Sequence, residues 1–81
     1  ITISDAVNTV KKLRGVEYNW KDTGERSMGL IAQEIEEVLP YLVHETENGK
    51  SVMYSNMIGL LIEAVKEQQE QIDELKAKLG E

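Results

Sequence analysis

The stretch SNMIGLLIEAVKEQQEQIDELKAKL, residues 55–79, carries a regular apolar repeat. With Ile58 at position a of a heptad, the a and d positions through Leu79 alternate at gaps of three and four residues, and Gln68 is their only polar member. A sustained repeat of this period is typical of helices that supercoil around a partner. The sequence therefore predicts a self-associating coil, and its interface comprises Tyr54, Ile58, Leu61, Val65, Gln68, Ile72, Leu75 and Leu79.

The apolar stripe of this helix narrows along its length. Between residues 57 and 65, Leu60 and Ile62 add apolar side chains at positions c and e, so we expect this half to pack on its own chain as well as on a partner. From Lys66 onward the stripe is confined to positions a and d. Isolated helices depend on packing for most of their stability, so we expect the second half of this helix to pack against other copies of the same chain.

The heptads leave the number of copies open. Isoleucine at a with leucine at d favours two strands, whereas a polar residue such as Gln68 at a core position specifies register and oligomer state at a cost in stability. Charge adds little to the choice of orientation, because Gln71 would face Lys76 across a parallel interface.

Composition favours oligomerisation as the source of extra stability. The hydrophobic core of an 81-residue chain contributes roughly 3–5 kcal/mol to stability. Such a chain therefore usually needs a further stabilising feature, such as disulfides, a metal or oligomerisation. There is no cysteine, which excludes disulfides, and the lone His44 argues against a first-row metal site. The net charge of −6 argues against nucleic acid and against an anionic membrane surface, and no apolar run is long enough to span a bilayer.

Four further elements are predicted upstream of the long helix. Residues 5–14 read as a short helix that Ser4 caps and Gly15 ends, and residues 16–20 alternate as a half-buried strand followed by a turn at 22–25. Residues 29–40 read as a second helix that Pro40 stops, and its apolar face holds Leu30, Ile31, Ile35, Val38 and Leu39.

A hairpin is expected around Asn48-Gly49, with strands at 41–45 and 50–54, and Ser55 is expected to cap the long helix. The predicted fold class is α+β, mainly α: two short helices and a β-hairpin at the base of one long C-terminal helix. We expect a single domain over residues 1–81, made of a small α/β part (1–54) and the coiled-coil helix (55–81).

The residues offer little catalytic chemistry. A Ser–Lys dyad is the one nucleophilic arrangement worth testing, and no serine has a lysine at a local dyad spacing. Glu34, Glu36 and Glu37 read as a solvated helix face, His44 as a surface or interface residue, and Trp20 with Tyr18 as core. We therefore predict that this chain is not an enzyme and binds no cofactor, metal or small-molecule substrate.

Three segments carry a resemblance to a known family: LRGVEYNWKD (13–22), MGLIAQEIEEVLP (28–40) and GKSVMYSNMIGLLIEAVKEQQEQI (49–72). In their order and spacing they resemble the C-terminal intramolecular chaperone domain of phage tailspikes, tail fibres and endosialidases. A similar domain occurs in the myelin regulatory factor family. The middle segment is the most specific, since a glycine, an apolar pair and Ala-Gln-Glu precede a proline-stopped helix.

The resemblance implies a homotrimer, with a parallel bundle of long helices and smaller elements protruding near its base. Such a domain follows a β-rich fibre or spike, aligns three chains while the stem folds in the host cytoplasm, and is then released by self-cleavage at a serine and a nearby lysine. The implied partners are two further copies and the upstream stem of the same polypeptide. The interface predicted from the heptads thereby becomes a trimer interface.

The chain departs from the family pattern at the cleavage motif, a Ser-Asp followed shortly by Leu-Lys. Ser4-Asp5 is followed by Ala-Val-Asn-Thr and aligns with the helix after the motif, so no catalytic role carries over to this chain. The chain begins with Ile1 rather than methionine, and we expect it to be a fragment whose cleavage site lies upstream. Two alternatives stay open: a generic oligomerisation module that permanently tethers another function, and an enzyme whose site is shared between protomers near Trp20 and His44.

Overall fold

The computed structural model describes residues 1–80 and contains helices and two antiparallel hairpins. The elements follow the order α1 (Ala6–Lys11), β1 (Val16–Asn19), β2 (Arg26–Gly29), α2 (Ala32–Val38), the 3-10 helix η1 (Pro40–Leu42), β3 (Val43–Thr46), β4 (Gly49–Val52) and α3 (Tyr54–Leu79). The α+β class, the hairpin before the last helix and the long last helix are confirmed.

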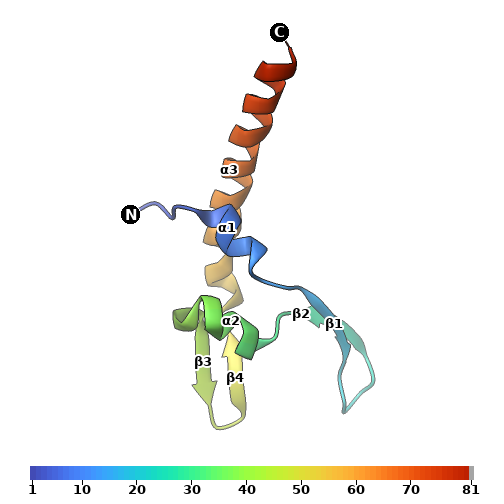
Figure 1. Cartoon of the computed structure of the whole chain (residues 1–81). Coiled ribbons are helices and arrows are strands. Elements are labelled where there is room, and N and C mark those ends of the chain that lie inside the picture. The colour runs from blue at the N-terminus through green and yellow to red at the C-terminus, as the bar shows by residue number, and fades with distance from the viewer. Residues whose placement is uncertain (81) are drawn as a thin grey trace.

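The molecule is elongated because α3 extends far beyond the elements at its base. Figure 1 shows α1 crossing the middle of α3, the two hairpins diverging below, and the C-terminal half of α3 projecting alone. The principal extents are 57 × 31 × 18 Å and the radius of gyration is 16.5 Å. A compact chain of this length has a radius of gyration of about 12 Å. Half of the long helix therefore has no packing partner within its own chain.

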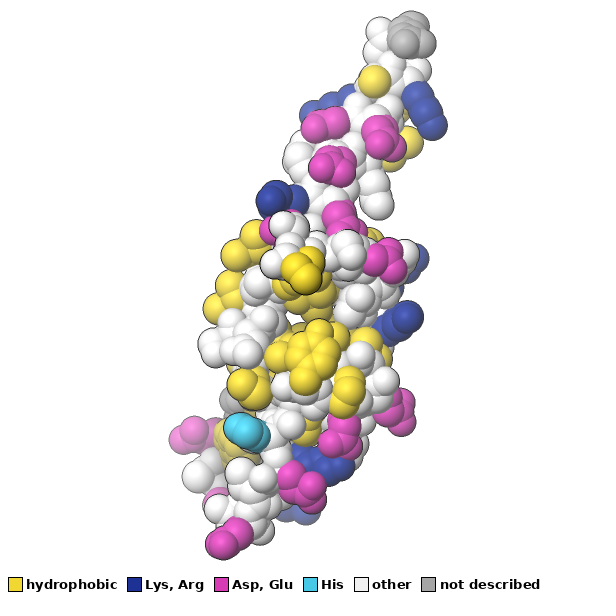
Figure 2. Space-filling model, turned by 90° about the vertical axis from the view of Figure 1, so that its left-hand side faces the viewer, with side chains coloured by type: hydrophobic (Ala, Val, Ile, Leu, Met, Phe, Trp, Pro, Cys, Tyr) yellow, Lys and Arg dark blue, Asp and Glu magenta, His cyan; other side chains and the backbone are white. Residues whose placement is uncertain are grey.

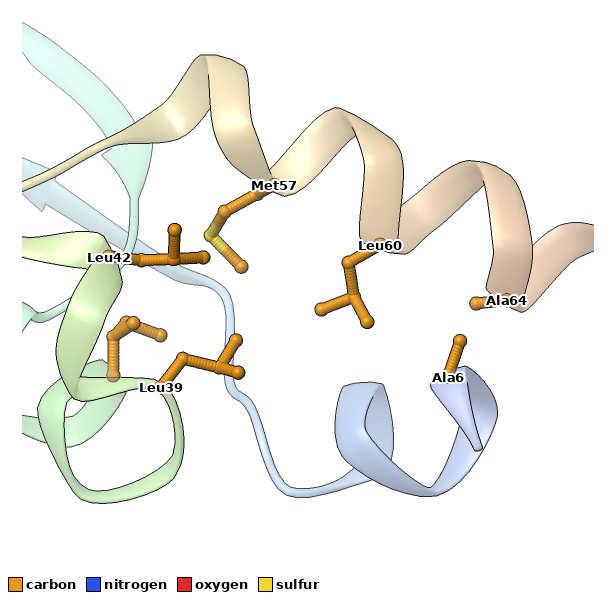
Figure 3. Packing of buried hydrophobic residues seen from close by; sticks show 7 residues of the cluster. Ala6, Leu39, Leu42, Met57, Leu60 and Ala64 are labelled. Atoms are coloured by element: carbon orange, nitrogen blue, oxygen red, sulfur yellow. The ribbon is translucent and has the colours of Figure 1, made fainter. Parts of the chain in front are cut away.

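The core lies between one face of α3 and the short elements packed on it. Met57, Leu60 and Ala64 are spaced by about one helical turn, so they line a single face of the helix. Ala6 of α1 meets this face at Ala64, and the α2–η1 corner meets it nearer the hairpins (Figure 3). The buried cluster consists of Ala6, Ile35, Leu39, Leu42, Met57, Leu60 and Ala64.

The structure corrects the sequence reading between residues 16 and 29. Arg26–Gly29 forms a strand that pairs with β1, in the register Val16↔Gly29 and Tyr18↔Ser27, so the fold has two hairpins instead of the one predicted. The short RSMG segment lacks an apolar alternation, which is why the pattern missed it. Trp20 lies after β1 and is 54% exposed, so its assignment to the core was wrong; its ring makes an edge contact with Tyr18.

Several predicted boundaries and caps also differ. Neither Ser4 nor Ser55 caps a helix: α1 follows Asp5, which has a φ of 56°, and α3 begins at Tyr54 after Met53. The first helix ends at Lys11, well before the predicted stop at Gly15. Residues 40–42 form a 3-10 helix, where the sequence predicted a helix stop followed by a strand. Proline is favoured in the first turn of a helix, and here it ends α2 and opens η1.

Candidate oligomerisation surface

The long helix α3 has two apolar faces, and only one is buried in the chain. Leu60 is 6% exposed within the core, whereas Leu61, the next residue, is 48% exposed. The exposed face continues along the whole helix, from Tyr54 at 51% to Leu79 at 86%. All eight residues of the predicted interface lie on this uncovered side, namely Tyr54, Ile58, Leu61, Val65, Gln68, Ile72, Leu75 and Leu79.

The total surface of the single chain is larger than that of a folded monomer of its mass. The accessible area is 6732 Å². A compact monomer of 9.2 kDa exposes about 4,900 Å². Figure 2 shows hydrophobic side chains gathered over the middle of one side of the molecule, while the projecting end of α3 carries mainly charged and polar groups. The excess, about 1,800 Å², exceeds the roughly 800 Å² that each partner buries in a standard interface.

The exposed face contains two apolar grooves that meet at Leu61. The smaller, of about 370 Å³, lies on α3 itself between Ile58, Leu61, Ile62 and Val65, with Lys66 at its edge. A depression formed by a and d residues of one helix is the kind of hole that receives a side chain from a neighbouring helix.

The larger groove has a volume of about 570 Å³ and is walled by three parts of the fold. One wall is α3, through Tyr54, Met57 and Leu61. The end of α1 and the chain that follows it supply the second wall, and the base of the β1–β2 hairpin supplies the third. Most of the lining is apolar, although Arg14 and Glu17 lie at its border.

Tyr54 serves its own chain as well as the predicted interface. The backbone N–H of Leu30 donates a hydrogen bond to the Tyr54 hydroxyl at 3.2 Å. A Cβ at Gly29 would lie 2.8 Å from the same oxygen, so the absence of a side chain at Gly29 permits this approach. The contact joins the β1–β2 hairpin to the first turn of α3, and no local pattern in the sequence predicts it.

Glu67 of α3 is hydrogen-bonded to the start of α1. Its carboxylate accepts hydrogen bonds from the backbone N–H groups of Ala6, at 2.7 Å, and Val7, at 3.0 Å. These bonds lower the pKa of Glu67, because they stabilise its ionised form, while partial desolvation opposes them. Glu67 thus takes the capping role that the sequence assigned to Ser4.

Two ion pairs connect α2 to its neighbours. Arg14 donates to both carboxylate oxygens of Glu34, at 3.1 and 2.6 Å, which raises the pKa of Arg14 and lowers that of Glu34. Lys50 of β4 donates to Glu36, and this hydrogen bond raises the pKa of Lys50. Glu34 and Glu36 were predicted to lie on a solvated face; both side chains are 40% exposed, and each also forms an ion pair on that face.

Trp20 and His44, the two residues considered for a shared site, belong to different hairpins. Trp20 follows β1 and His44 lies in β3, and the two hairpins diverge from the base of α3 (Figure 1). Across residues 1–80, the structure brings no three histidine, cysteine or acidic side chains together as a metal site would require. Over the same residues, no helix has both the length and the apolar character of a membrane span.

Comparison with known proteins identifies the family of this chain. Residues 1–44 match the family described as the chaperone of endosialidase. The chain belongs to this family. It is also 38% identical, over 95% of its length, to the long tail fibre protein Gp37 of Enterobacteria phage K3, and equally to that of Enterobacteria phage T2. The Gp37 protein of Salmonella phage S16 is 36% identical over 84% of the chain.

The chain spans only a small part of these relatives, 7% of the phage K3 protein and 10% of the phage S16 protein. The family match confirms the resemblance noted in the sequence, at the level of the chaperone-of-endosialidase family. The part of the chain that matches the family, residues 1–44, includes α1, the β1–β2 hairpin, α2 and η1.

Proposed function

We propose that this member of the chaperone-of-endosialidase family is the intramolecular chaperone of a phage tail fibre. Three copies associate through α3 in parallel and thereby align the chains of the upstream stem. The observation that carries the proposal is the uncovered heptad stripe on α3, which lies beside the buried face yet belongs to no core of its own chain. The tail fibre relatives support a role in fibre assembly.

The physical advantage of such a chaperone is kinetic. A stem whose strands come from three chains forms non-local contacts slowly, and its open edges are prone to aggregate meanwhile. Helices form quickly from local contacts, and association through them holds the three stem ends at an effective concentration of the order of millimolar. Alignment therefore precedes stem folding, in the host cytoplasm during virion assembly.

In this proposal the chaperone leaves once the stem has folded. The family resemblance implies cleavage by a serine and a lysine, and we place both upstream of Ile1, because Ser4-Asp5 lacks the lysine of the motif. Residues 1–81 then perform no catalytic step themselves. A permanent tether is the competing function, and it differs in one observable: the mature fibre would retain this chain.

The proposal is tested with the fibre stem expressed ahead of this chain. The variant Ile58→Asp/Leu61→Asp places charges in the exposed stripe, and Ala77→Asp at position f serves as the matched control. We expect the stripe variant to abolish soluble, detergent-resistant stem trimers and the control to form them normally. Stem trimers that form equally well with the stripe variant would contradict the proposal, and the intact mass of the mature fibre separates a released chaperone from a tether.

A further inference from the structure

Two features of the single chain are left unmatched by the a and d stripe. The first is Ile62, which is 53% exposed at position e and forms one edge of the smaller groove on α3. The second is the larger groove, about 570 Å³, beside Tyr54, Met57 and Leu61. One is an exposed apolar side chain beside the a and d positions, and the other is an apolar groove that its own chain leaves open.

Heptad geometry places these two features against each other in neighbouring copies. In a parallel coil, a residue at position g of one helix faces the e residue of the following heptad on its neighbour. Met57 occupies position g, and the e residue of the following heptad is Ile62. Because Met57 lines the larger groove, a parallel neighbour would bring its Ile62 to the α3 wall of that groove.

We infer that Ile62 of the neighbouring copy fills the groove between α3 and the base of the β1–β2 hairpin. The inference rests on the parallel association proposed above, and it extends the interface from the coil to the small elements at its base. The groove is continuous with the seam, because Leu61 borders both this groove and the smaller one on α3. An antiparallel pairing would instead set g against g and would leave the groove open.

The excess surface of the chain agrees with an interface of this extent. The predicted seam becomes a thin stripe beyond residue 65, where the large apolar side chains lie only at positions a and d. The hairpin base and the end of α1 add an apolar wall next to the wider half of the stripe. An interface that covers both the seam and this apolar wall buries more of the roughly 1,800 Å² of surplus surface than an interface limited to the seam.

A size exchange across the interface tests the inference. Gly15 lines the groove, and a Cβ built on it meets no atom within 4 Å, so Gly15→Leu is chosen to add a side chain at the groove. Ile62→Ala shortens the proposed occupant. We expect each single variant to raise the dissociation constant of the trimer about tenfold, and the double variant to bind about tenfold more tightly than the product of the two effects predicts.

Sedimentation equilibrium supplies the dissociation constants, and Ile31→Ala is the control, since Ile31 is 37% exposed and does not line the groove. Independent effects of Gly15→Leu and Ile62→Ala would overturn the inference while leaving the trimer intact. An unchanged dissociation constant for Gly15→Leu would also overturn it, because the groove would then be empty in the assembly. A wild-type chain that stays monomeric would overturn the proposed function as well.

Discussion

Leu60 and Leu61 are consecutive residues of α3, and they lie on different faces of the helix. Leu60 is 6% exposed and packs in the core of its own chain, whereas Leu61 is 48% exposed and borders both apolar grooves. Successive residues of a helix point about 100° apart, so a single helix supports two packing surfaces. The base of α3 is therefore held by its own chain on one face and is open to a neighbour on the other.

The two leucines predict different outcomes for the same substitution. Leu60→Ala removes buried methyl groups, so we expect it to lower the free energy of unfolding by about 2–5 kcal/mol. We expect Leu61→Ala to leave the core packing of the chain intact and to weaken association. Near-ultraviolet circular dichroism reports the packing, and sedimentation equilibrium reports association. An intact trimer with Leu61→Ala at every concentration would count against the uncovered face as the interface.

Replacement of the polar seam residue is predicted to stabilise the assembly. Gln68→Ile extends the apolar seam through a core position, so thermal unfolding should shift to higher temperature. The control is Glu70→Ile at position f, which adds the same side chain on the outer face of the coil and should leave the midpoint nearly unchanged. Equal shifts for the two variants would show that position 68 does not face a neighbour.

The anchor between Glu67 and α1 predicts a pH dependence. Because the pKa of Glu67 is lowered in the folded chain, its stabilising effect is complete above the unfolded value of about 4.3 and is lost as the pH falls through the lower folded value. Glu67→Gln should therefore lower the midpoint of thermal unfolding at neutral pH, and this difference should shrink and disappear as the pH falls through the lowered pKa of Glu67. Glu74→Gln removes the same charge from the exposed part of α3 and is the control; a constant difference between wild type and Glu67→Gln would argue against the anchor.

The close approach of Tyr54 to Gly29 predicts coupled substitutions. Tyr54→Phe removes the hydroxyl that accepts the Leu30 N–H, at a cost of about 1 kcal/mol. Gly29→Ala places a Cβ in the space of the same hydroxyl, so it should destabilise the chain when Tyr54 is present. The double variant should be more stable than the sum of the two effects predicts, as measured by urea unfolding. Strict additivity would mean that the two residues do not meet.

The long helix could be predicted from the sequence, and a seam proposed for it, because the heptad pattern is local and periodic. One heptad frame assigns every position from Ile58 to Leu79, and the seam residues that it names stay a prediction. The β3–β4 hairpin was also predicted from a local signal, the Asn48-Gly49 dipeptide; in the structure the turn lies one residue earlier, at 47–48, and Gly49, with a φ of 114°, begins β4.

The contacts that position the base of the seam could not be predicted in this way, because they join distant segments. Glu67 meets Ala6 across 61 positions, and the Tyr54 hydroxyl meets Leu30 across 24. In neither pair does the sequence around one residue indicate which distant residue it contacts. The strand β2 was missed for a related reason: its pairing with β1 supplies the order that its own residues, Arg26–Gly29, do not encode.

The mass of the chain in solution tests the central claim most directly. Light scattering across a concentration series should give a particle of three times 9.2 kDa that dissociates only on dilution. A folded chain that keeps a mass of 9.2 kDa at every concentration would contradict the account, because the uncovered face of α3 would then have no copy of itself to cover it.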